Sequence, residues 1–235
     1  RRKDLKPLDI ENPLTRAILE AVGRFRYLLS HQIMALTAVP SRKTWVETRL
    51  RRMWDERLLF RIQVRVAHLP AIYTLDAQGA AALKHLWGLA PGNLDWRKSQ
   101  KYVAYFGLAH FLLANEALIA ATLACQREGY PCSFLDEKAL RRMRLGRLRP
   151  DRYLCIQRKG KVASLFLEAD RRTEGKTAFQ TKVRRYHHLL RSGEFARKLA
   201  VHHTRPPSYF KVLVVTPARK RGGRRRAEEL TTWIR

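Results

Sequence analysis

Three runs of apolar residues at helical spacing open the chain. Asn12 followed by Pro13 predicts a helix start just before the first run. Ser30 is expected to cap the second helix, which should end before Pro40, and Ser41 is expected to cap the third. The positions expected to face the core along these helices are Leu14, Ile18, Ala21, Val22, Phe25, Ile33, Leu36, Val46, Leu50, Met53 and Trp54.

The third predicted helix carries a polar and basic face opposite its apolar stripe. A face of this kind can contact phosphates and base edges in the major groove of DNA. We therefore expect a recognition helix, whose DNA-contacting residues are Arg42, Lys43, Thr44, Glu47, Thr48 and Arg51. Trp45, on the same helix, is expected to be a core residue instead of a platform for base stacking.

Alternating residues after this helix predict a β-hairpin. One strand is expected over residues 59–66 and another over residues 71–75, with a break at Pro70 between them. The order helix, helix, basic helix, hairpin is that of a winged helix-turn-helix, in which the hairpin is the wing. The wing residues expected to contact DNA are Arg61, Gln63 and Arg65.

A linker is expected over residues 88–93, after a helix that Asp76 caps. It divides the chain into a winged-helix domain, residues 1–98, and a second domain, residues 99–235. The second domain opens with an apolar helix over residues 108–127, which should be buried. Its polar interruptions are His110, Asn115 and Glu116. They either bond to one another or to a loop, or Glu116 supports a metal site, and both interpretations stay open.

Acidic residues at the ends of two predicted strands form the centre of the second domain. Strands over residues 153–156 and 165–167 are joined by a short basic turn, which predicts a hairpin. Glu168 and Asp170 should point to the same face, and Asp151 precedes the other strand. Carboxylates so close together raise one another's pKa unless a cation is present. They can hold Mg²⁺ for a nuclease, or simply cap the sheet and pair with nearby arginines.

The remaining pattern completes an α/β domain. A helix follows the acids, with its apolar stripe at Phe179, Val183, Tyr186 and Leu190. Lys182, Arg184 and Arg185 lie outside that stripe, and Arg184 and Arg185 are expected to contact DNA. A strand is expected over residues 209–215. The run 219–226 contains six basic residues and is expected to be a mobile phosphate-binding loop, before a final helix from Ala227.

Composition favours a folded protein that binds nucleic acid. The 235 residues include 48 Lys and Arg against 20 Asp and Glu, a net charge of +28, so double-stranded DNA is the expected partner. No apolar stretch is expected to span a bilayer and no signal peptide is present, so we expect a cytoplasmic protein without a membrane partner. Cys125, Cys132 and Cys155 are an odd number without metal-ligand spacing and should be reduced thiols. Because Arg1 is not a methionine, we expect a segment of a longer protein.

The acidic segments resemble two known patterns. Pro150-Asp151 and Glu168-Ala169-Asp170 stand where the restriction-endonuclease-like core, the PD-(D/E)xK type, has its Pro-Asp and Glu-x-Lys. From Leu14 to Val215 the chain resembles the replication-relaxation family of plasmids and mobile elements, which is linked to replication and mobilisation. The most specific segment is Leu-Glu-Ala-Asp-Arg-Arg-Thr-Glu at residues 167–174, where Arg172 stands at a position that is often glycine.

The resemblance implies an α+β fold, with an N-terminal winged helix-turn-helix followed by an α/β restriction-endonuclease-like domain. The catalytic residues that it implies are Asp151, Glu168, Asp170 and Lys182. The implied ligands of Mg²⁺ are Glu116, Asp151, Glu168 and Asp170. Asp170 replaces the lysine that orients the water in active nucleases, so either Lys182 or Lys176 substitutes for it or the core has lost its chemistry.

We expect a DNA-binding protein of a plasmid, phage or integrated mobile element that acts in replication, mobilisation or DNA processing. A metal-dependent endonuclease that nicks or cuts DNA is one alternative, and a homodimeric transcription repressor is another. Other replication or mobilisation proteins are further candidate partners. The adjacent pairs His187-His188 and His202-His203 diverge instead of converging on one metal, so a histidine relaxase is not expected. No Gly-rich phosphate loop is present, so ATP chemistry is not expected either.

Overall fold

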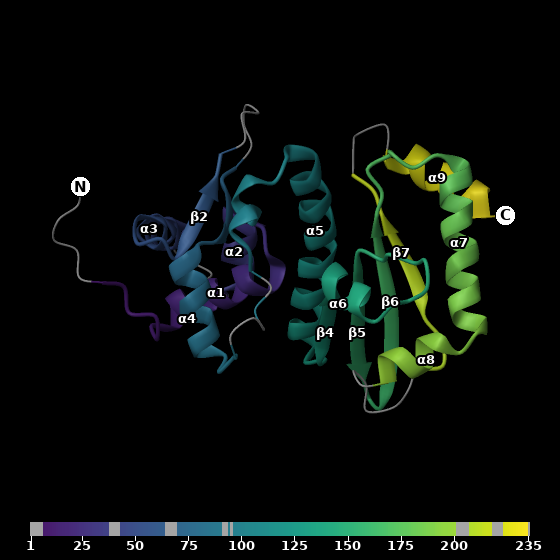
Figure 1. Cartoon of the computed structure of the whole chain (residues 1–235), viewed down its shortest axis with the longest axis horizontal. Coiled ribbons are helices and arrows are strands. Elements are labelled where there is room, and N and C mark those ends of the chain that lie inside the picture. Colours follow the sequence, from purple (N-terminus) through teal and green to yellow (C-terminus); the bar gives the residue numbers. More distant parts are fainter. Residues whose placement is uncertain are drawn as a thin grey trace. The chain divides into compact units, whose positions relative to one another are not determined.

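The computed structural model of the chain describes residues 7–37, 43–63, 70–90, 94, 96–200, 207–217 and 223–234. They form a mixed α+β protein with two sheets (Figure 1), so the predicted α+β class is confirmed. The chain divides into two compact units, Arg1–Asn115 and Glu116–Arg235, within a long helix. The predicted linker over residues 88–93 and the predicted boundary between functional domains after residue 98 stay predictions.

The first unit alternates helices with short strands. In chain order it contains α1 (Pro13–Phe25), β1 (Leu28–Leu29), α2 (Ser30–Leu36), α3 (Lys43–Asp55), β2 (Leu59–Ile62), β3 (Ile72–Leu75), α4 (Ala77–Leu86), the short 3-10 helix η1 (Lys98–Tyr102) and the start of α5 (Tyr105–Glu128). The strands form an antiparallel sheet in the order β1-β3-β2. The sequence predicted the β2–β3 hairpin but not β1, because two residues carry no periodic signal.

Capping side chains set two of the helix starts. The Asn12 carboxamide accepts hydrogen bonds from the backbone N–H groups of Leu14 and Thr15, and the Asp76 carboxylate accepts one from Ala77. Both predicted caps are therefore confirmed. The predicted Ser30 cap is wrong, because Ser30 is already the first residue of α2 and the N-cap is the preceding leucine. Ser41 lies outside the described residues.

The core of the first unit lies on both faces of its sheet. Along α3, Val46, Leu50 and Met53 are fully buried, as predicted. Trp54 was expected beside them but is 44% exposed, and Trp45, also expected in the core, is 57% exposed. These two predictions are wrong because both indoles lie on the flanks of the buried stripe. A second cluster joins Tyr27, Ile62, Ile72 and Leu108.

The second unit is a four-stranded sheet with helices packed on it. In chain order it contains the rest of α5, β4 (Cys132–Asp136), α6 (Glu137–Arg142), β5 (Arg152–Arg158), β6 (Lys161–Ala169), α7 (Lys176–Arg191), α8 (Glu194–Leu199), β7 (Lys211–Val215) and α9 (Gly223–Ile234). The strand order is β4-β5-β6-β7, and only β6 and β7 run parallel. The sequence predicts the order helix, strand, strand, strand, helix, strand, helix, with the first of these strands over residues 130–135. This order is confirmed, with α6 and α8 added.

A two-residue turn closes the β5–β6 hairpin that carries the acids. Lys159 and Gly160 both have positive φ, 46° and 75°, and Arg158 pairs with Lys161 on either side of them. This is the geometry of a tight hairpin turn whose twist matches that of the strands. The predicted hairpin is confirmed, and its open end brings the residues that precede β5 next to those that follow β6.

An aromatic core packs α7 and α8 against one face of this sheet. The Phe166 ring lies 5.1 Å from Tyr153, 5.4 Å from Tyr186 and 5.9 Å from Phe195, measured between ring centroids. The stripe of α7 was partly mispredicted: Leu189 is buried, whereas Leu190 is exposed. Phe179 contacts Trp233 of α9, so α7 and α9 pack together beside the sheet.

Helix α5 contradicts the expectation that no apolar stretch of the chain is long enough to span a bilayer. Its segment Gly107–Glu128, 22 residues, is long and apolar enough to cross a membrane by length and composition. Core helices meet the same criterion, and Asn115 is buried within the first unit, where its side-chain amide donates to the carbonyls of Phe25 and Tyr27. The interpretation of Asn115 as a residue that bonds to a neighbouring loop is therefore confirmed.

Candidate functional site

The three predicted acids lie at the open end of the β5–β6 hairpin. Asp151 directly precedes β5, Glu168 is the next-to-last residue of β6, and Asp170 directly follows β6. Arg152 pairs with Leu167, so the next position of this antiparallel register places Asp151 opposite Glu168. Glu168 and Asp170 are 4% and 6% exposed. Two nearly buried carboxylates require partners, and these partners decide what the group can do.

Glu168 is bonded on both of its carboxylate oxygens by residues of α7. Lys182 Nζ lies 2.9 Å from Glu168 Oε2, and the Tyr186 hydroxyl donates to Oε1. Burial raises the pKa of Glu168 to about 7, while the Lys182 charge opposes that rise and the Asp151 charge adds to it. Near neutral pH this carboxyl therefore exchanges a proton, as a group in an acid–base site would.

Lys182 joins a second acid to the group. Its Nζ lies 2.6 Å from Glu174 Oε1, in the segment that leads into α7. Burial alone would lower the pKa of Lys182, but the carboxylates of Glu168 and Glu174 together keep it above its ordinary value. The predicted reach of Lys182 back to the acids is confirmed as geometry. Its catalytic function stays a prediction.

Asp170 belongs to a different set of contacts. Arg226 Nε lies 2.5 Å from Asp170 Oδ2, and the Arg172 N–H donates to Oδ1 at 2.8 Å. Arg226 also donates to the Glu174 carbonyl at 2.8 Å, and its guanidinium lies over the Trp233 ring. The expectation of a mobile loop over residues 219–226 is wrong for its last residues, which are part of α9. Residues 219–222 lie outside the described part of the chain.

Asp151 faces the backbone of β6 as well as the acids. The Ala169 N–H donates to Asp151 Oδ2 at 2.7 Å, which fastens the end of β6 to the start of β5. Glu116, the fourth predicted metal ligand, is solvent-exposed on α5. His110, which we associated with it, packs edge-on against the Phe111 ring.

The donor set does not fit the expected Mg²⁺ site. Mg²⁺ needs several oxygen ligands around one point, commonly carboxylates and waters. Both oxygens of Glu168 and both of Asp170 instead accept hydrogen bonds, from Lys182, Tyr186, Arg172 and Arg226. Among the residues that the structure describes, no group of three or more His, Cys, Asp or Glu side chains is arranged to hold a metal ion. We therefore assign no chemical step to a metal here.

The second predicted surface is the outer face of α3. Thr44, Glu47, Thr48 and Arg51 are all exposed, as a face that contacts DNA requires. Two further predicted contacts on this helix cannot be placed: Arg42 lies outside the described residues, and only the backbone of Lys43 is described.

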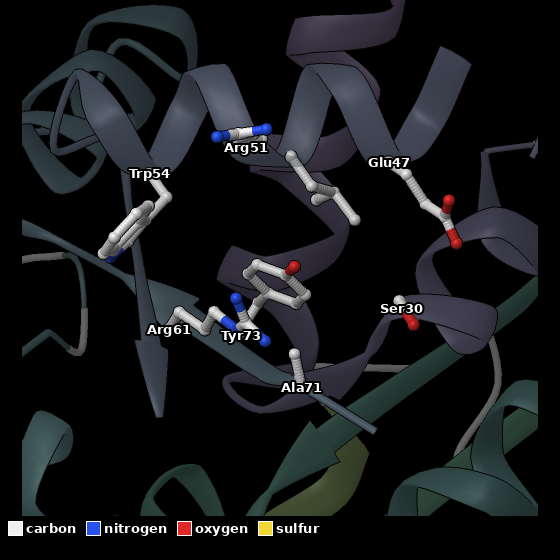
Figure 2. A pocket seen from close by; sticks show the side chains of 8 residues that line it. Ser30, Glu47, Arg51, Trp54, Arg61, Ala71 and Tyr73 are labelled. Carbon is white, nitrogen blue, oxygen red and sulfur yellow. The ribbon is translucent and has the colours of Figure 1, made fainter. Parts of the chain in front are cut away.

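The hairpin next to α3 presents two of its three predicted contacts. Arg61 and Gln63 are exposed, whereas Arg65 falls in the segment 64–69, outside the described residues. Between the hairpin and α3 lies a pocket of about 440 Å³ (Figure 2). Its lining residues are Ser30, Glu47, Leu50, Arg51, Trp54, Arg61, Ala71 and Tyr73. The sequence did not predict this pocket, because its walls come from four elements.

The predicted contacts on α7 lie on its outer side. Arg184 and Arg185 are both exposed, and Arg185 also donates to the Arg147 carbonyl at 3.4 Å. His187 and His188 are exposed on the same helix, next to Arg184 in a shallow pocket. The pair His202-His203 lies outside the described residues.

Three comparisons with known proteins give one match. A family model described as replication-relaxation matches residues 19–202, most of the chain and parts of both units. Comparison with curated proteins and comparison with solved structures each found no match. The match covers α3, the hairpin, the acids and Lys182, and it stops before Arg226.

Proposed function

The chain belongs to the replication-relaxation family, which is linked to replication and mobilisation of plasmids and mobile elements, and on that premise we propose that it is a DNA-binding protein. The N-terminal unit docks on duplex DNA as a winged helix-turn-helix. The C-terminal unit, with a restriction-endonuclease-like fold, adds a second basic surface.

The order of elements in the first unit supports the winged-helix part of the proposal. A winged helix-turn-helix has a short strand between its first two helices, a recognition helix third and a hairpin after it. Here β1 lies between α1 and α2, α3 follows, and β2 and β3 form the hairpin. In the sheet, β3 lies between β1 and β2. The hairpin therefore pairs, through β3, with the strand that lies between α1 and α2.

The observation that carries the proposal is the exposed polar face of α3 beside an exposed arginine of the hairpin. Thr44, Thr48 and Arg51 are side chains of the kinds that bond to base edges and phosphates. Arg61 lies on the hairpin, where a wing contacts the neighbouring backbone. A helix dedicated to packing inside a protein would instead bury this face.

The electrostatics of the chain agree with this docking mode. A net charge of +28 attracts a polyanion over a Debye length, about 10 Å at 0.1 M salt. Arg184 and Arg185 on α7 give the second unit exposed basic side chains of its own. Double-stranded DNA is the partner whose phosphates can contact the basic side chains of both units.

Metal-dependent DNA cleavage is a second candidate function. The placement of Asp151, Glu168 and Lys182 at one end of the β5–β6 hairpin favours it. The hydrogen bonds that occupy Glu168 and the ion pair that occupies Asp170 favour binding without cleavage instead. We therefore propose that the acids stabilise the second unit and that the protein positions DNA for another enzyme.

Filter binding of labelled duplex DNA tests the first proposal. The purified chain should retain duplex at low salt and release it as salt is raised, since phosphate contacts dominate such binding. Retention that stays weak even at low salt would contradict DNA binding, whatever the state of the acidic group.

A further inference from the structure

The pocket in Figure 2 is formed by one flank of α3 and one face of the β2–β3 hairpin. Glu47, Arg51 and Trp54 are four and three residues apart, so their side chains follow one side of the helix. Arg61 pairs with Tyr73 across the hairpin, which places both side chains on the same face of the sheet. Ser30, at the start of α2, closes one end.

Aromatic groups give the pocket flat apolar surface. Trp54 is 44% exposed, although tryptophan is a costly residue to leave in water. Tyr73 lies opposite α3 and points its hydroxyl toward that helix in Figure 2. A flat ring that enters this space can stack on the indole of Trp54.

Charged groups surround the aromatic surface. Burial raises the pKa of Tyr73, the Arg61 charge opposes that rise, and the Glu47 charge adds to it. Both charges therefore act on the Tyr73 hydroxyl. Arg51 adds a second guanidinium on the helix side. The pocket thus combines two cations, which suit a phosphate, with a carboxylate, which accepts hydrogen bonds from amino groups.

We propose that this pocket binds one unpaired nucleotide, with its base stacked on Trp54 and its phosphate near Arg51 and Arg61. Glu47 accepts a hydrogen bond from an exocyclic amino group, which favours cytosine or adenine over thymine. The inference rests on the proposed DNA binding, and it names the structure that the protein recognises: a duplex from which one nucleotide is extruded, as at a bulge. A free nucleotide has the same chemistry.

The size and position of the pocket agree with such a ligand. A volume of about 440 Å³ lies within the range of roughly 300–1,000 Å³ that small-molecule sites span. Duplex DNA without unpaired bases cannot offer a base face, since its bases are stacked on one another. Thr44 and Thr48 lie further round α3 and can contact the duplex while the pocket holds the extruded nucleotide.

The test compares two labelled duplexes that differ by one unpaired cytosine, using fluorescence anisotropy. The wild-type chain should bind the bulged duplex about tenfold more tightly, the gain expected from stacking one base on one aromatic ring. Trp54→Ala and the bulkier Trp54→Leu should lose the preference. Trp45→Ala is the matched control: Trp45 is also exposed on α3, but nine residues from Trp54 it lies on the opposite side of the helix, and the preference should persist.

Equilibrium dialysis with dCMP distinguishes the two sources of the nucleotide. Retention of dCMP that Trp54→Leu abolishes, without a preference for the bulge, supports a free nucleotide as the ligand. Equal binding of both duplexes together with no retention of dCMP overturns the inference, as does a preference that survives in both Trp54 variants. A chain that binds neither duplex refutes the proposed DNA binding, and the dialysis then still tests the pocket.

Discussion

Asp170 and Arg226, 56 residues apart in the chain, form a nearly buried ion pair with 2.5 Å between Oδ2 and Nε. The pair fastens α9 to the end of β6, next to the residue that a nuclease would use as a metal ligand. Each oxygen of Asp170 has a partner, because the guanidinium pairs with Oδ2 and the Arg172 N–H donates to Oδ1. The pair therefore explains how Asp170 can be buried without a metal.

Replacing Arg226 with alanine should destabilise the second unit by about 3–5 kcal/mol, because it leaves the Asp170 charge buried without a partner. Urea unfolding measures this. Arg225→Ala is the control, since the Arg225 side chain is 82% exposed and that of Arg226 only 6%. Equal stabilities of the two variants would mean that the ion pair contributes nothing.

The double variant Asp170→Asn/Arg226→Ala should be more stable than Arg226→Ala alone, because a neutral amide is less costly to bury than an unpaired carboxylate. The same urea experiment decides this. A double variant that loses the sum of both single effects would show that the two residues act independently.

The free energy of unfolding should fall as pH rises, because the buried Glu168 carboxyl then loses its proton. Its pKa is about 7 in the folded chain, above the ordinary value of 4.5, so its contribution to stability is complete below about pH 4.5 and is lost as pH rises through 7. The free energy of unfolding of the wild type, relative to Glu168→Gln, should decrease by about 3 kcal/mol between pH 4.5 and 8. A difference that does not change with pH would contradict the assigned environment of Glu168.

Incubation of supercoiled plasmid with Mg²⁺ or Mn²⁺ should leave the DNA uncut at concentrations where it is fully bound. The reason is that hydrogen bonds already occupy Glu168 and Asp170. Asp151→Ala serves as the control. Nicking by the wild type that disappears in this variant would establish the endonuclease alternative and show that the acids rearrange around a metal.

The cysteine thiols should react slowly in the native chain. Burial and the neighbouring Cys125 thiol raise the pKa of Cys132 to about 12, and burial raises the pKa of Cys155. Because the thiolate is the reactive form, a disulfide reagent at pH 8 should label these two residues far more slowly than in guanidinium. Rapid native labelling of Cys132 or Cys155, located by mass spectrometry, would contradict this.

Local chemistry made much of the fold predictable. Asn12 and Asp76 predict helix starts because their side chains accept hydrogen bonds from the first free backbone N–H groups. These bonds are local, so the prediction needs no knowledge of the tertiary structure. A short basic turn between two strand-like segments likewise located the β5–β6 hairpin and put Asp151, Glu168 and Asp170 at one end of it. Helices α6 and α8 were missed because six residues are too few for a periodic pattern.

Contacts that depend on tertiary packing were harder to predict from the sequence. The reach of Lys182 back to the acids could be anticipated because Lys182 lies on the helix that follows them. The partner of Asp170 could not, since Arg226 lies beyond a strand and a basic run that resembles a loop. Trp45 and Trp54 were misplaced for a geometric reason. Successive helical residues are about 100° apart, so Trp54 turns away from the stripe that Met53 occupies.

The salt dependence of duplex binding, measured by anisotropy with Arg51→Ala, Arg61→Ala and the exposed control Arg127→Ala, tests the docking surface most directly. Each of the first two variants should weaken binding and lower the slope of log affinity against log salt by about one, the effect of losing one phosphate contact. Arg127→Ala, at the end of α5, should bind as the wild type does. Wild-type affinity and slope in both Arg51→Ala and Arg61→Ala would contradict docking through α3 and the β2–β3 hairpin.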